Sequence, residues 1–157
     1  MVTLREATDN DMVLVMAWRS NPLIYAGFEQ QKAPLAYEGH YNWWKSQKNW
    51  KQWIIVYGEG KYKRDVGQIN LRRLDTDCPE VGYFIGEIPL WNKGIATRSV
   101  EEVLEWLEEH SYRKVCAEVK KDNPASAHVL RKMGFVFRND DILSGLEIFQ
   151  KEIIAVV

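Results

Sequence analysis

The segment from Glu80 to Leu107 constrains the fold of this chain more than any other part of the sequence. It opens with an apolar, β-branched and aromatic run that is typical of a buried strand, and Pro89 then interrupts the pattern. From Asn92 onward, apolar residues recur at helical spacing to about His110. The sequence therefore predicts a strand that passes through a tight turn into the N-terminus of an amphipathic helix.

The turn before this helix is suited to an anionic ligand. The first amides of a helix have no intrahelical partner and lie at the positive end of the helix dipole, so they bind phosphate well. Gly94 and Ala96 would let a ligand approach the backbone closely. The turn has a single glycine and no Gly-Lys-Ser/Thr ending, which excludes a P-loop and a dinucleotide fingerprint. We expect a phosphate or pyrophosphate site of another kind.

Length and composition limit the classes of protein to which the chain can belong. A chain of 157 residues, 46% apolar and 27% charged, is expected to form one globular domain over residues 1–157. A net charge of −1 supplies no basic field for nucleic acid, and no apolar run reaches membrane-spanning length. We therefore expect neither nucleic acid nor a membrane as a partner.

Cysteine content and the first residues predict the compartment. Cys78 and Cys116 are too few for a disulfide framework and lack the spacing of metal ligands. Val2–Glu6 lacks the apolar core of a signal peptide. These observations predict a cytoplasmic protein without a bound metal.

Periodicity and turn residues predict an α+β fold in which about seven strands form a mixed sheet flanked by about four helices. The expected strands are 2–8, 52–57, 65–74, 80–86, 114–119, a strand beginning at 135–138, and 146–154. The expected helices follow Thr8, cover 36–48 and 92–110, and run from the cap Asp122-Asn123-Pro124 to Met133, with a further short helical piece at 22–27.

Four short motifs follow one another in the second half of the chain: Glu80–Ile85, Trp91–Thr97, Asp122–Ser126 and Lys132–Phe135. Each motif alone is common, but their order and the elements on which they lie are specific. Two earlier fragments, Leu4–Thr8 and Trp18–Pro22, fit the same pattern. Together they cover nearly all of the chain and resemble the GNAT superfamily of N-acetyltransferases, in the branch of ribosomal-protein N-terminal and nucleotide amino-sugar acetyltransferases.

The resemblance implies an enzyme that uses acetyl-CoA as co-substrate, with a mostly antiparallel sheet. Its two central strands, here Glu80–Gly86 and Lys114–Val119, would splay apart and admit the thioester between them. The edge of Phe84, Ile85 and Gly86 would pair with the pantetheine amides like an added strand. Further family positions are the backbone amides of Lys93, Gly94, Ile95, Ala96 and Thr97 for the pyrophosphate, Asn123 and Ser126 for the pantetheine arm or phosphate, and Arg98, Arg131 and Lys132 for the 3′-phosphate.

The sequence departs from the family at three positions. Trp91 occupies the first position of the pyrophosphate loop, and Asn92 stands where glycine is common. Leu130 occupies the position at which many members carry a tyrosine that protonates the departing thiolate. The usual general acid is therefore missing.

Direct attack by an amine on a thioester needs a group that deprotonates the amine and one that protonates the thiolate. Glu80 is our first candidate for the base, because it lies at the end of a splayed strand, and Glu118 is the second. A solvated strand-end charge is the alternative interpretation of Glu80. His128 is the candidate acid in place of the tyrosine, although a histidine on a helix surface is more often inert.

Two acceptor classes fit the sequence. Trp18–Pro22, followed by Tyr37, Glu38, His40 and Trp43, resembles members that acetylate an amino group on a nucleotide-linked sugar, and aromatic walls suit the stacking of a base. The alternative acceptor is a protein N-terminus. A module that binds CoA without catalysis is a third interpretation, motivated by Leu130.

The apolar segment 153–157 is the part of the sequence that bears on the oligomeric state. It would suit an edge strand that pairs with a second subunit, giving a homodimer. A buried terminal strand explains the same residues equally well.

Overall fold

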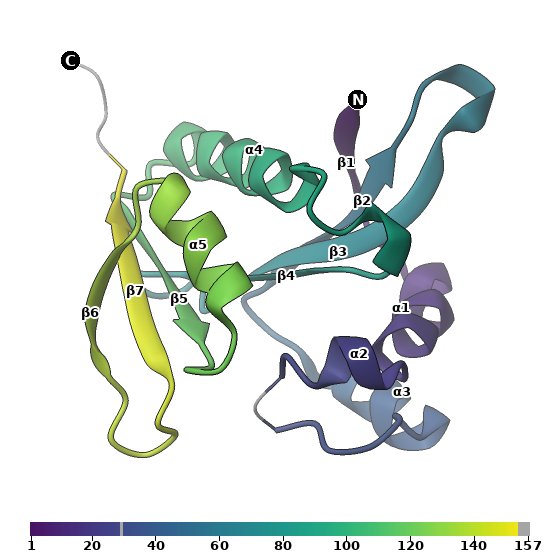
Figure 1. Cartoon of the computed structure of the whole chain (residues 1–157), viewed down its shortest axis with the longest axis horizontal. Coiled ribbons are helices and arrows are strands. Elements are labelled where there is room, and N and C mark those ends of the chain that lie inside the picture. Colours follow the sequence, from purple (N-terminus) through teal and green to yellow (C-terminus); the bar gives the residue numbers. More distant parts are fainter. Residues whose placement is uncertain (29, 154–157) are drawn as a thin grey trace.

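The computed structural model describes residues 1–28 and 30–153. Its centre is a seven-stranded sheet in the order β1-β2-β3-β4-β5-β7-β6 (Figure 1). Every neighbouring pair is antiparallel except β4 and β5, which run parallel. The strands are β1 (Val2–Glu6), β2 (Lys51–Tyr57), β3 (Arg64–Arg72), β4 (Glu80–Ile85), β5 (Lys114–Val119), β6 (Val136–Asp140) and β7 (Glu147–Glu152).

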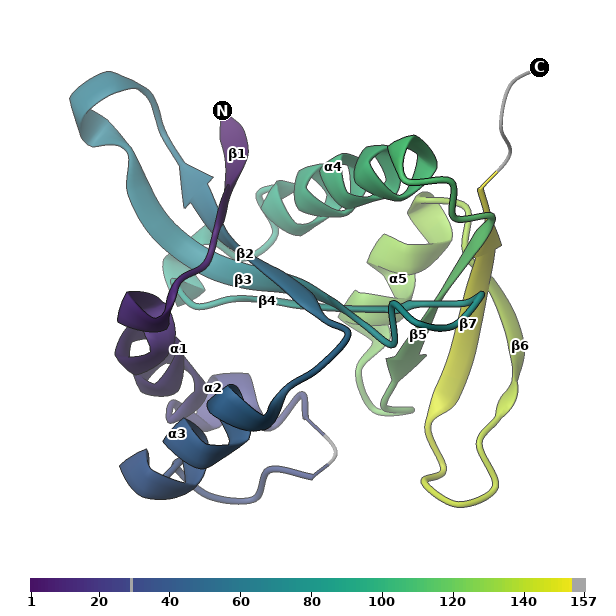
Figure 2. The same cartoon turned by 180° about the vertical axis from the view of Figure 1, so that it is seen from behind.

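Helices cover both faces of the sheet, as Figures 1 and 2 show from opposite sides. The α-helices are α1 (Met12–Arg19), α2 (Pro22–Tyr25), α3 (Tyr37–Ser46), α4 (Ile95–Glu109) and α5 (Pro124–Lys132), and short 3-10 helices cover Asp9–Asp11, Gly60–Tyr62 and Ile88–Leu90. The predicted α+β fold with a mixed, mostly antiparallel sheet is confirmed. None of the described helices is long and apolar enough to cross a membrane.

Alternation along β2 separates two apolar cores. Trp53 and Ile55 belong to the core beneath α4 and α5, whereas Ile54 belongs to the core under α1 and α3. Successive side chains of a strand point to opposite faces, so one strand supplies both layers. The aromatic residues of α3 enter the second core through Trp44, which is 4% exposed.

The central strands β4 and β5 share one paired position, Glu80 with Cys116. β4 is paired along its whole length with β3 on its other side, so the edge of Val81–Ile85 that faces β5 is open. The expected divergence of the two central strands is therefore present, and it begins one residue into β4.

The helix expected from Asn92 begins instead at Ile95. Asn92 and Gly94 adopt φ values of 63° and 79°, in the left-handed region that helices exclude and that Asn and Gly tolerate best. The last strand ends at Glu152. Its expected end at Ile154 lies outside the described residues, as does most of the segment 153–157 that would suit a dimer edge.

Candidate active site

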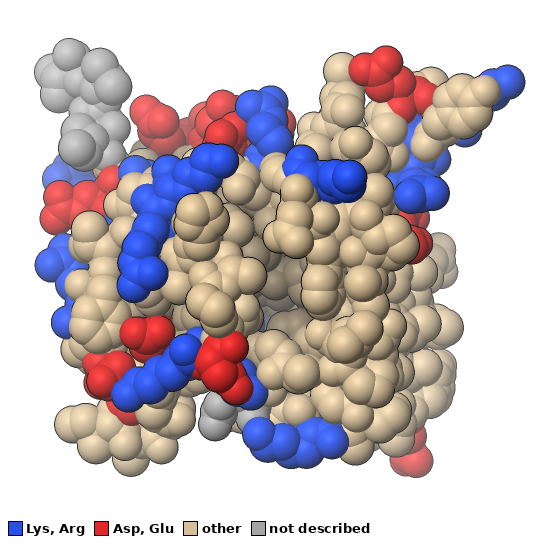
Figure 3. Space-filling view, in the orientation of Figure 1, with Lys and Arg blue, Asp and Glu red and all other residues tan. Residues whose placement is uncertain are grey.

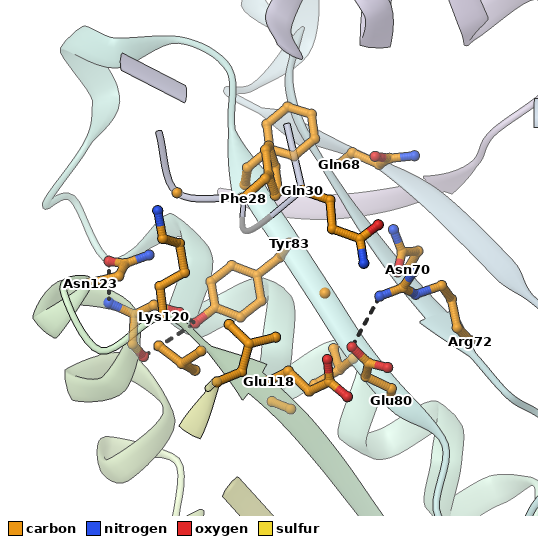
Figure 4. Close-up of a pocket in the computed structure, with 18 of the residues that line it drawn as sticks. Phe28, Gln30, Gln68, Asn70, Arg72, Glu80, Tyr83, Glu118, Lys120 and Asn123 are labelled. Carbon is orange, nitrogen blue, oxygen red and sulfur yellow. Dashed lines mark hydrogen bonds and ion pairs between the residues drawn. The ribbon is translucent and has the colours of Figure 1, made fainter. Parts of the chain in front are cut away.

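A cavity of about 490 Å³ lies where β4 and β5 diverge. Figure 3 shows the molecule hollowed between the α5 side and the α2 side, and Figure 4 shows polar side chains converging on the space. The wall combines the loop after α2, the end of α1 and residues of β3, β4, β5 and α5. Its members include Arg19, Phe28, Gln30, Trp43, Gln68, Asn70, Arg72, Arg73, Glu80, Tyr83, Phe84, Glu118, Lys120, Asn123, Ser126 and Leu130.

The open edge of β4 is partly occupied by the chain itself. The carbonyl of Ile85 accepts the indole N–H of Trp91 at 2.9 Å. The amide of Gly86 donates to Val66 at 2.7 Å, toward β3. Of the three residues assigned to pantetheine pairing, only Phe84 also lines the cavity. Trp91, which departs from the family pattern, therefore caps the far end of this edge.

The N-terminus of α4 fits a phosphate group. Its cap, Gly94, forms no side-chain hydrogen bond with the first turn, and that turn contains no acidic residue. The amides of Ile95, Ala96 and Thr97 have no intrahelical partner, because no helical carbonyl precedes them by four residues. A Cβ at Gly94 would meet no atom within 4 Å, so no protein atom packs against this side of the turn. Lys93 is exposed beside it.

One face of α5 lines the cavity. The side chain of Asn123 caps the helix by accepting the amide of Ser126 at 3.3 Å, which leaves its Nδ2 without a role in the cap. Ser126 and Leu130 are four residues apart and therefore lie on one helix face, and both line the cavity. Leu130 is fully buried, so a tyrosine at this position would start from the cavity wall.

His128 lies on the other side of α5. It follows Ser126 by two positions, which is about 200° around a helix of 3.6 residues per turn. The side chain is exposed and does not line the cavity. The structure does not bring this predicted acid together with the other candidate residues.

Tyr83 supplies the hydroxyl that sequence reasoning did not find. It comes from β4, and its Oη lies 3.1 Å from the hydroxyl of Ser126 across the cavity. Burial raises the pKa of Tyr83, and the hydrogen bond to Ser126 opposes the change. The phenol is therefore protonated at neutral pH and oriented by α5. Its only sequence signal is its position beside Phe84 in the strand motif.

The two candidate bases lie in one charged cluster. Glu80 is 7% exposed and accepts hydrogen bonds from Arg72 at 3.0 Å and Arg73 at 2.9 Å. Glu118 lies 3.8 Å from Arg73 and forms no shorter ion pair with a described residue. Burial first, and then the charge of Glu80, raises the pKa of Glu118, while Arg73 and Arg72 oppose the change. Glu118 is thus the carboxylate with fewer close cationic partners.

Cys116, paired with Glu80 in the sheet, is not a nucleophile. Burial raises the pKa of its thiol to about 12, so the thiolate that nucleophilic attack needs is absent at neutral pH. No group of three or more His, Cys, Asp or Glu side chains within residues 1–28 and 30–153 is arranged to hold a metal ion.

The part of the cavity wall supplied by α1, α3 and the loop after α2 is aromatic and cationic. The guanidinium of Arg19 lies 4.8 Å from the ring centre of Phe28 and 5.5 Å from that of Trp43. His40 stacks on Trp43 at 5.7 Å, but it is 4% exposed and does not line the cavity. His40 therefore supports the wall from behind, and Trp43 is the aromatic residue of α3 that faces the space.

Known proteins share both sequence and fold with this chain. A family model described as an acetyltransferase (GNAT) domain matches residues 1–136. An uncharacterized protein of Methanocaldococcus jannaschii is 46% identical over 134 residues, which are 85% of this chain and 28% of that protein. The chain thus spans little more than a quarter of the curated relative that it matches.

Solved structures give the same picture. A crystal structure of a domain from Methanocaldococcus jannaschii superposes with a TM-score of 0.93 at 41% identity, covering 97% of this chain and 98% of that one. An aminoglycoside acetyltransferase in complex with coenzyme A gives 0.82 at 15% identity, over 97% and 95%. A spermidine N-acetyltransferase from Vibrio cholerae, in complex with CoA and spermine, gives 0.75 at 17% identity, over 95% and 92%. The last two show a shared fold.

Proposed function

The chain belongs to the GNAT acetyltransferase family, and we propose that it transfers the acetyl group of acetyl-CoA to a primary amine by direct attack. The observation that carries this proposal is the open edge of β4 between an uncapped helix N-terminus and a cavity with two carboxylates. The high pKa of Cys116 also supports direct attack, because this thiol cannot first accept the acetyl group as a thiolate.

Residues of this chain fit acetyl-CoA at separate places. The amides of Lys93–Thr97 would hold the pyrophosphate, with Gly94 leaving the approach free. On the edge of Phe84–Gly86, it is Phe84, which lines the cavity, that would contact the pantetheine arm together with the Nδ2 of Asn123, with Ser126 beside them. When bound, acetyl-CoA supplies an activated acetyl group as a thioester.

Proton transfer falls to groups that line the cavity. We assign the uptake of the amine proton to Glu118, directly or through one water, because it lines the cavity, its one described ion pair is a long one at 3.8 Å, and burial raises its pKa in the direction that makes a carboxylate a stronger base. Glu80, the first candidate from the sequence, has both carboxylate oxygens engaged by arginines. Tyr83 is the proton donor that we propose for the thiolate in place of the residue missing at Leu130. The alternative acid, His128, would have to act from an exposed position.

The acceptor that we propose is an amino group on a nucleotide-linked sugar. Trp43 and Phe28 supply aromatic surface beside the cavity, and Gln30, Gln68 and Asn70 supply amides suited to sugar hydroxyls (Figure 4). A protein N-terminal α-amine is the alternative within catalysis. A cytoplasmic location and the absence of a second domain within residues 1–157 remain predictions from the sequence.

Binding and turnover test the proposal separately. Acetyl-CoA at 100 times its Kd should stabilise the protein by about 2.7 kcal/mol, visible as a higher melting temperature. Thiol release is then followed over a panel of amines that includes an amino sugar nucleotide and peptides with free N-termini. Stabilisation without turnover on any amine would favour the non-catalytic CoA-binding module. If acetyl-CoA does not raise the melting temperature, both the acetyltransferase and the CoA-binding module are excluded.

Matched variants identify the proton-transfer groups. Glu118→Gln and Tyr83→Phe should each lower kcat by about 100-fold or more, with Glu105→Gln and Tyr62→Phe as exposed controls of the same chemistry. We expect the pH–rate profile of Glu118→Gln to lose its acidic limb and that of Glu80→Gln to keep it. The reverse pattern would return the role of base to Glu80.

A further inference from the structure

Arg19 carries a charge that no described acidic side chain neutralises. It ends α1 and lines the cavity, and its Nε is buried without a hydrogen-bond partner. Within residues 1–28 and 30–153, no carboxylate lies within ion-pair distance of its guanidinium. A half-buried cation without an anion loses part of its hydration, and contact with the rings of Phe28 and Trp43 offsets only part of that cost.

The surroundings of Arg19 increase the positive charge. Four cationic side chains, Arg19, Arg72, Arg73 and Lys120, line the cavity together with two acidic ones, Glu80 and Glu118. The cavity thus has an excess of two positive charges among its described residues, whereas the whole chain has a net charge of −1. Burial, followed by the charge of Arg72, lowers the pKa of Arg19. The described charges of the wall favour an anion and oppose a polycationic acceptor.

Two buried acceptors accompany the excess of cations. Asn70 Oδ1 and Gln31 Oε1 are buried without a hydrogen-bond partner, and both residues line the cavity. Figure 4 shows the side chain of Asn70 beside that of Arg72, on the wall opposite Tyr83. A ligand with hydroxyl or ammonium groups would supply the missing donors. The wall therefore combines an unpaired cation with unpaired acceptors.

We infer that Arg19 forms an anion subsite, and that the acceptor carries a phosphate or carboxylate group in the same molecule as the amine. This inference rests on the proposed function, and it deepens it by naming the chemistry that selects the acceptor. The planar guanidinium, held between two aromatic rings, presents fixed N–H donors that match the oxygens of such a group. The amine would then lie toward Glu118, at the other charged part of the wall.

The test measures anion binding without requiring turnover. The protein is saturated with CoA, so that the N-terminus of α4 is filled, and is titrated by calorimetry with inorganic pyrophosphate, inorganic phosphate and acetate in turn. Arg19→Gln should weaken binding of the preferred anion by roughly 10- to 100-fold, the worth of a charge-assisted hydrogen bond. Arg64→Gln, which removes an exposed arginine outside the cavity, should leave it unchanged. Arg19→Lys should retain part of the affinity.

The outcomes separate this inference from the proposed function. Binding of pyrophosphate or phosphate above acetate identifies a phosphate acceptor, and the opposite order identifies a carboxylate. No saturable anion binding by the CoA-saturated wild type, or equal affinities in Arg19→Gln and wild type, overturns the subsite while leaving acetyl transfer intact. Failure of acetyl-CoA to raise the melting temperature overturns the proposed function, and the titration of the unliganded variants still reports on Arg19. The melting temperature of each variant shows that it is folded.

Discussion

The contact between Gly86 and Trp18 gives the most direct test of the packing beneath the site. A Cβ at Gly86 would lie 2.3 Å from Cγ of Trp18 and 2.4 Å from its Cδ2, far inside ordinary van der Waals contact of about 3.5–4 Å. Trp18 is 8% exposed and meets Phe84 edge-on at 6.1 Å, so its indole has little room to withdraw. Gly86→Ala should therefore force the end of β4 and α1 apart.

The magnitude follows from overpacking in a rigid environment. Such substitutions cost about 1–3 kcal/mol, and the overlap with a whole indole places this one near 2–3 kcal/mol. At an unfolding entropy of about 2.1 cal/mol/K per residue, the melting temperature should fall by about 6–9 °C. Gly39→Ala is the control, because its Cβ meets nothing within 4 Å in α3 and alanine favours a helix by roughly 0.5–1 kcal/mol.

Thermal and urea denaturation of both variants measures the effect, and a double-mutant cycle assigns its cause. In a Trp18→Leu background, Gly86→Ala should cost at least 1 kcal/mol less than in the wild type, at about the level expected for residues in contact. A fall in melting temperature below 2 °C, or an equal cost in both backgrounds, would refute the argument that the indole excludes a side chain at Gly86.

Two further predictions concern the site. Asn123→Ala removes the cap of α5 and should lower stability by about 1 kcal/mol, whereas Asn42→Ala on the exposed face of α3 should not; equal denaturation midpoints for the two variants would contradict the cap. Because the pKa of Glu118 is raised in the folded state, its ionisation costs stability as pH rises above its ordinary value of about 4.3. Glu118→Gln should therefore be more stable than wild type at pH 7–8 and equal to it near pH 4 in urea titrations. A wild type that is more stable than the variant at neutral pH would show that folding lowers the pKa of Glu118 instead of raising it.

Much of the fold was accessible from the sequence because the relevant signals are local. The cap at Asn123, the end of α5 near Met133 and the strand at 52–57 depend on residues close together in the chain. The motifs Glu80–Ile85 and Trp91–Thr97 also identified the GNAT superfamily, which the family match confirms. The narrower assignment to a branch stays a prediction, because the matches name the domain and not an acceptor.

The candidate site depended more strongly on contacts between distant residues. Arg72 opposes Glu80 because of the register between β3 and β4, and Arg73 reaches Glu118 across the diverging strands. No local pattern specifies either contact. Leu130 and His128 are only two positions apart on α5, but only the packing of the helix shows that Leu130 faces the cavity and His128 does not. A list of titratable residues could name these groups, but it could not show which of them are placed to transfer a proton.

The sequence by itself determined the strand, the turn and the helix at Glu80–Leu107, because periodicity, proline and glycine act on neighbouring residues. It also predicts a phosphate site at the turn. Only the tertiary structure decided that Trp91 covers part of the β4 edge, that Tyr83 meets Ser126 across the cavity, and that Arg19 lies among aromatic rings without a described anion. These contacts join residues up to 43 positions apart. They depend on how the strands and helices pack against one another, which no segment encodes alone.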